Sequence, residues 1–133
     1  MKKLPAFIAL LIALTFMACT RNGSNNVDTF TTTNPPAGKY KVTYYIDEGN
    51  DKTASFSGYT FEFVAGGNFI ATGSGNSLTG SWSETSSKLI ITLPVTTNPL
   101  KEIDDDWLKE EKTPNTIKLK DDSKEERLHF TRL

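Results

Sequence analysis

Alternation of apolar and polar residues at every second position is the feature that most constrains the fold of this chain. The alternation recurs in short segments that turn residues separate. A period of two is typical of β-strands with one buried face. The pattern predicts eight strands, at residues 40–46, 59–63, 69–72, 78–82, 89–93, 107–112, 116–120 and 128–130.

Most of the connections between these segments are short. Residues 65–68 and 73–76 are glycine-rich turns, and residues 113–115 contain Pro114. Strands joined by such turns pair with their sequence neighbours as antiparallel hairpins. We therefore predict an all-β fold, a small eight-stranded antiparallel up-and-down barrel, because closure removes exposed sheet edges. An open meander or a two-layer sandwich is the alternative.

One connection, residues 94–105, is long. Within it Asn98 and Pro99 form the pattern of an N-cap followed by proline at the first helical position. Leu100, Ile103 and Trp107 then keep helical spacing. The segment is predicted to contain a short helical turn and to act as a lid.

The N-terminal residues have the layout of an export signal. Lys2 and Lys3 precede an apolar run over residues 4–18, which ends at Cys19, the only cysteine. The run is shorter than the roughly 20 residues of a membrane-spanning helix. Residues 16–19, Phe-Met-Ala-Cys, resemble a bacterial lipobox. This resemblance implies that Cys19 carries acyl chains, palmitate among them, that anchor the protein in a membrane.

The residues around Cys19 also favour a location. Thr20 stands where aspartate would mark retention in the inner membrane, and no acidic cluster follows. We therefore expect an outer-membrane lipoprotein of the cell envelope that faces the periplasm. An ordinary secretory signal with an incidental cysteine is the alternative.

Composition divides the chain into three parts. We predict a signal peptide over residues 1–18, the lipidated cysteine with a flexible, Asn- and Thr-rich linker over 19–37, and one barrel domain over 38–133. Without the signal, 13 Lys and Arg face 16 Asp and Glu. This balance gives no reason to bind nucleic acid. Charged residues concentrate in 101–133, where we expect them on the outer faces of the last three strands.

A family resemblance rests on aromatic and glycine positions. Gly38-Lys39-Tyr40 resembles the Gly-x-Trp opening of lipocalins, and Arg127 or Arg132 is similar to the arginine that packs across that ring. Residues 58–63, 79–83 and 105–107 are similar to lipocalin-like lipoproteins of Gram-negative bacteria. The resemblance covers residues 38–133, and it implies a barrel whose interior takes a small ligand.

The sequence provides little catalytic chemistry. His129 is the only histidine, and it faces outward if Leu128 and Phe130 face inward. With Cys19 committed to lipid, no triad, zinc site or Cys-His pair is expected. Acidic residues cluster in 47–51 and 104–106, where carboxylates suit a hard cation, but neither run has the spacing of a calcium loop. We predict no enzyme activity, no metal and no cofactor.

The aromatic residues of the first four strands are the remaining candidates for a site. We predict that they line an apolar ligand pocket or fill the core of the barrel: Tyr40, Tyr44, Phe61, Phe63, Phe69 and Trp82. The first case makes the protein a binder of a small apolar ligand. The second makes it an interaction or structural module with a protein partner in the envelope.

Overall fold

The computed structural model describes residues 36–122 and 125–133. Over these residues nine strands and two 3-10 helices follow one another: β1 (Gly38–Asp47), β2 (Asn50–Asp51), η1 (Thr53–Phe56), β3 (Tyr59–Phe63), β4 (Asn68–Gly73), β5 (Asn76–Glu84), β6 (Lys88–Thr92), η2 (Leu100–Ile103), β7 (Asp106–Lys112), β8 (Thr116–Lys120) and β9 (Arg127–Arg132). The predicted signal, Cys19 and the linker up to residue 35 lie outside the described residues.

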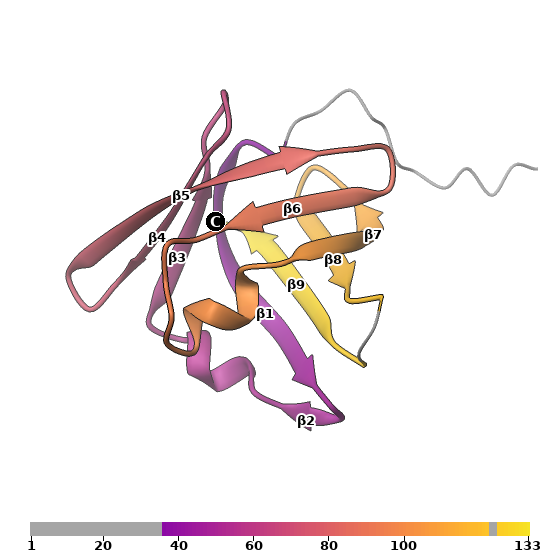
Figure 1. Ribbon diagram of the computed structural model, residues 1–133, viewed down its shortest axis with the longest axis horizontal. Coiled ribbons are helices and arrows are strands. Elements are labelled where there is room, and N and C mark those ends of the chain that lie inside the picture. Colours follow the sequence, from indigo (N-terminus) through magenta and orange to yellow (C-terminus); the bar gives the residue numbers. More distant parts are fainter. Residues whose placement is uncertain (1–35, 123–124) are drawn as a thin grey trace, which may run out of the picture.

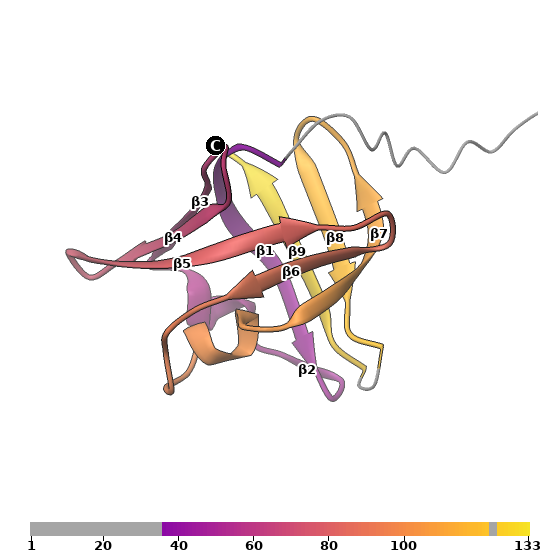
Figure 2. The ribbon, with the colours of Figure 1, turned by 45° about the horizontal axis from the view of Figure 1, so that its top comes forward.

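Eight of these strands close into an up-and-down barrel. Each strand from β3 to β9 pairs antiparallel with the next, β1 pairs with β3, and β9 returns to β1. The two-residue strand β2 only extends the end of β1 as a hairpin. Figures 1 and 2 show β1 and β9 side by side at the seam. The predicted all-β barrel and its eight strands are confirmed.

The two ends of the barrel differ. We call the end where β1 begins the base and the opposite end the mouth. Both 3-10 helices lie at the mouth (Figures 1 and 2). Phe56 of η1 and Ile103 of η2 are 1% and 0% exposed, so each helix inserts one apolar side chain into the core.

The lid segment contains the predicted helical turn, with a correction at its start. The helix η2 begins at Leu100, and Pro99 occupies the N-cap position without a side-chain hydrogen bond. The predicted capping role of Asn98 is therefore wrong, because the helix starts one residue later. The helix η1 was not predicted, since residues 52–58 carry no helical repeat of apolar residues.

A β-bulge in β1 changes which tyrosine faces the interior. The pairing of β1 with β9 shifts register between Val42 and Tyr44. Beyond the shift Tyr45 is fully buried, whereas Tyr44 is 38% exposed. The predicted inward orientation of Tyr44 is wrong, because an inserted residue moves all later side chains to the opposite face.

The base is closed by a contact between the first and last strands. Gly38 has φ of 141°, and a Cβ there would overlap the guanidinium of Arg132. That guanidinium lies 5.0 Å from the centre of the Tyr40 ring. Of the two arginines that the lipocalin resemblance offered, Arg132 takes this place.

Candidate functional site

The centre of the barrel is filled by aromatic rings. Tyr40, Phe61, Phe63 and Phe69 are each no more than 1% exposed. The ring of Phe130 lies between 5.6 and 6.5 Å from all four, centre to centre. A side chain that lined a water-sized cavity would keep accessible area, so these rings pack against one another.

The other two predicted ligand-binding residues are placed differently. Trp82 is half-buried, with its ring centre 5.8 Å from that of Phe63, and its indole N–H donates to the Val64 carbonyl at 3.0 Å. Tyr44 lies on the outer face, where its ring stacks on His129 at 4.6 Å. The structure thus brings together four of the six predicted residues and adds Phe130 to them.

Partly exposed apolar side chains occur around the mouth. They pack against the core from β3, β5, the lid segment and η2: Tyr59, Leu78, Val95 and Leu100. The Tyr59 ring covers Gly73 so closely that a Cβ there would overlap it. The mouth therefore offers apolar surface that solvent and a ligand can reach.

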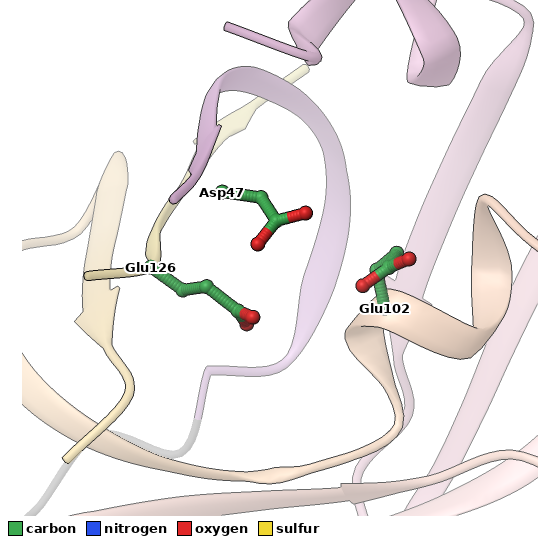
Figure 3. A group of neighbouring side chains, drawn as sticks. All are labelled: Asp47, Glu102 and Glu126. Carbon is green, nitrogen blue, oxygen red and sulfur yellow. The ribbon is translucent and has the colours of Figure 1, made fainter. Parts of the chain in front are cut away.

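Three carboxylates also converge at the mouth. Asp47 at the end of β1, Glu102 of η2 and Glu126 before β9 point toward one another (Figure 3). Their nearest oxygens all lie within 4.8 Å of one another, and Glu126 is only 3% exposed. Lys52 forms an ion pair with Asp47, and the Tyr45 hydroxyl donates to Glu102 at 3.2 Å. These donors offset the mutual repulsion of the acids.

Burial and the three carboxylates act on Tyr45. Burial raises the pKa of the Tyr45 hydroxyl well above its ordinary value, and the negative charges of Glu126, Glu102 and Asp47 raise it further. The oxygens are of the type that a hard cation prefers. The hydrogen bond from Tyr45 and the ion pair with Lys52 already engage the carboxylates of Glu102 and Asp47.

The structure places the acidic residues of the two runs in different surroundings. Only Asp47 of the first run joins the carboxylate cluster. In the second run, Asp104 accepts from the Leu93 amide at 3.0 Å and pairs with Lys101, and Asp106 pairs with Lys88 at 2.6 Å. Their roles are to hold the lid segment and the start of β7.

A second set of charges faces the interior near the base, against expectation. Lys109 and Lys112 lie opposite the buried residues Leu119 and Ile117 and share their face. A bulge between Lys109 and Glu111 brings Lys112 to this face in place of Glu111. The charged outer faces predicted for the last three strands are present, as the Glu111–Lys118 pair shows, but Lys109 and Lys112 are exceptions that face inward.

These lysines meet the carboxylate of Glu84. Lys109 Nζ lies 3.0 Å from Glu84 Oε1, and Lys112 Nζ lies 2.8 Å from the same oxygen. The side chains of Lys109, Lys112 and Glu84 are 2%, 8% and 17% exposed. Sequence reasoning missed this group. Lys112 reaches the inner face only through the bulge, and Lys109, two residues after the buried Trp107, was predicted to be a surface charge.

His129 faces outward, as predicted from its neighbours. Leu128 and Phe130 are fully buried, while His129 is partly exposed and stacks on Tyr44. Partial burial lowers the pKa of the His129 imidazole, and the positive charge of Lys118 lowers it further. The residue is thus part of a surface stack on the seam of the barrel.

Comparison with known proteins defines the class of the fold. A DUF4847 family protein from Bacteroides vulgatus ATCC 8482 superposes with a TM-score of 0.57 and 14% identity, over 74% of this chain and 94% of that one. A lipocalin-like protein from Bacteroides uniformis ATCC 8492 superposes with a TM-score of 0.56 and 17% identity, over 73% and 97%.

At these low sequence identities, the chain resembles the two solved structures in its fold alone. The chain forms a lipocalin-like barrel, as the sequence resemblance implied. No protein-family model matches the sequence. No curated protein matches it either. Among the residues that the structure describes, no helix has the length and hydropathy to cross a membrane.

Proposed function

We propose that this chain is a lipid-anchored, non-enzymatic binding protein of the cell envelope that holds a small apolar ligand at the mouth of its barrel. The lipobox-like residues before Cys19 support an anchor in the outer membrane on the periplasmic side. Barrels of this class commonly hold ligands at or inside their mouths. The N-terminal sequence thus supports the location, and the fold supports the position of the binding site.

One observation supports placing the ligand at the mouth and not among the rings. Apolar side chains in the ring cluster are occluded, whereas Tyr59, Leu78, Val95 and Leu100 keep accessible area. Val95 and Leu100 belong to the predicted lid over residues 94–105. An apolar ligand between this segment and β3–β5 would cover these four side chains and gain from their removal from water.

A fluorescent apolar probe tests the proposal. We expect N-phenyl-1-naphthylamine to bind residues 20–133, which keep every barrel residue and omit both the apolar run over residues 4–18 and Cys19. Leu100→Asn should weaken this binding about tenfold, since it places an amide on the apolar surface. The matched control is Leu108→Asn, because Leu108 is a half-buried leucine that faces outward from β7. Equal affinity in both variants would refute the site.

The filled ring cluster favours a second candidate, an interaction module with an envelope protein partner. Its outer face on β7–β9 carries ion pairs such as Glu111–Lys118 at 2.7 Å, which a charged partner could rearrange. Crosslinking of the anchored protein to one partner, with a yield that falls as salt rises, would support this alternative. Failure to crosslink in intact cells would count against it.

A further inference from the structure

We propose that the inward-facing charges near the base form a binding site for a small oxyanion, either a carboxylate or a phosphate group. The site consists of Lys109, Lys112, Glu84 and the turn after β5. It lies at the opposite end of the barrel from the mouth, so the proposal does not depend on the apolar site.

The charge of this group is unbalanced. Two ammonium groups share one carboxylate, since Glu84 is the one acid among the described residues that pairs with either lysine. Both lysine side chains are more than nine-tenths buried. A net positive charge in such surroundings is costly, and an anion that reaches it would be bound by charge-assisted hydrogen bonds.

The donors of Lys109 leave room for a ligand. Its ammonium has three N–H groups. One is directed to Glu84 and another to the carbonyl of Thr85 at 2.6 Å. The third remains for an incoming oxygen. The Thr85 hydroxyl oxygen accepts from the Lys88 amide at 2.9 Å, so its own hydrogen also remains available to donate.

A depression in the surface leads to these donors. It has a volume of about 260 Å³ and is lined by Glu84, Thr85, Ser86 and Lys109. Its size suits a small anion or a headgroup. Glu84 fixes both ammonium groups, but it also lines the depression, where its negative charge opposes an anion. Because glutamine keeps the length of this side chain and removes its charge, Glu84→Gln should strengthen anion binding.

Thermal unfolding of the full chain in non-ionic detergent tests the site. The Tm in inorganic phosphate is compared with the Tm in sodium chloride of equal ionic strength. Phosphate well above its Kd should raise the Tm by about 5 °C. Lys109→Met should abolish the rise and Glu84→Gln should enlarge it. Lys118→Met, which removes a lysine from the outer face, should leave the rise unchanged. The proposal would be overturned if phosphate raised the Tm of Lys109→Met as much as that of the unaltered chain. It would also be overturned if phosphate raised the Tm of neither.

Two further measurements complete the test. If Lys109→Met does not fold, NMR of the unaltered chain should show the amides of Thr85 and Ser86 shifting with phosphate, and unshifted signals would overturn the proposal. Micelles doped with phosphatidylglycerol then separate the sources of the anion. A larger rise in Tm than with phosphate identifies a lipid headgroup, and a smaller one identifies a free anion.

Discussion

Arg132 at the end of the last strand donates a hydrogen bond of 2.8 Å to the hydroxyl of Tyr40 near the start of the first. The same guanidinium donates through Nε to the Pro114 carbonyl at 2.6 Å. One side chain thus joins the seam between β1 and β9 to the turn between β7 and β8. We infer that this contact fixes the base of the barrel, and it explains why glycine stands at position 38.

Removing this guanidinium should destabilise the barrel. Arg132→Met keeps the aliphatic stem but loses the cation–π contact and the hydrogen bond to Tyr40, so we expect the free energy of unfolding to fall by about 2 kcal/mol. Urea denaturation measures the change. Arg127→Met is the control, because Arg127 makes an exposed ion pair with Glu110 at 3.6 Å and a long hydrogen bond to the neighbouring Glu126 carbonyl at 3.4 Å. Equal losses in the two variants would contradict the role of Arg132.

The close approach of β5 to β6 predicts a sharp difference between two glycines. A Cβ at Gly80 would overlap the carbonyl oxygen of Thr92, which is backbone and cannot rotate away. Gly80→Ala should therefore lower the free energy of unfolding by about 3 kcal/mol. At Gly58 a Cβ meets nothing within 4 Å, so Gly58→Ala should be neutral or slightly stabilising. Thermal unfolding of both variants checks the prediction, and similar Tm values would refute it.

The ring cluster and the mouth should respond differently to substitution. Phe63→Leu removes ring contacts in the core and should lower the free energy of unfolding by about 1 kcal/mol while probe affinity stays the same. Leu100→Asn should show the reverse pattern, with weaker probe binding and a smaller change in stability. Urea denaturation and fluorescence titration of both variants give the comparison. Loss of probe binding in Phe63→Leu alone would place the ligand among the rings.

The raised pKa of Tyr45 predicts a loss of stability in alkali. Below pH 10 the hydroxyl is protonated in both the folded and the unfolded chain, so it adds no pH dependence. Above pH 10 the unfolded chain releases this proton while the folded chain retains it. Stability should therefore fall by about 1 kcal/mol from this residue between pH 10 and 11.

Substitution of Tyr45 isolates this contribution. The variant Tyr45→Phe should show a shallower decline in the free energy of unfolding between pH 9 and 11, measured by urea denaturation. An unchanged slope in Tyr45→Phe would show that neither burial nor the carboxylates at the mouth raise the pKa of this hydroxyl.

The strands and the barrel were predictable because their signal is local. The alternation within each segment indicates which of its side chains are buried, and short turns leave few ways to pair the strands. The orientations of Tyr44 and Lys112 were not predictable, since both follow bulges. A bulge depends on the partner strand, so the alternation within one strand does not reveal it.

The grouping of the candidate site residues was harder to predict than the strands, because it depends on closure of the barrel. Asp47, Glu102 and Glu126 meet because three separate connections end at the mouth. Nothing in their sequence spacing indicates this convergence. The aromatic residues were found as a group because their spacing places them on one face, but the sequence could not decide between a pocket and a filled core. Exposure of the individual rings provides that answer.

The central claim is that an apolar ligand lies at the mouth, outside the ring cluster. A crystal structure with a bound brominated alkane tests it most directly, because the anomalous signal of bromine locates the ligand. We predict a bromine peak beside Leu78 and Leu100, under the lid segment. A peak among Phe61, Phe63 and Phe130, or no peak at a concentration that saturates the fluorescence assay, would contradict the claim.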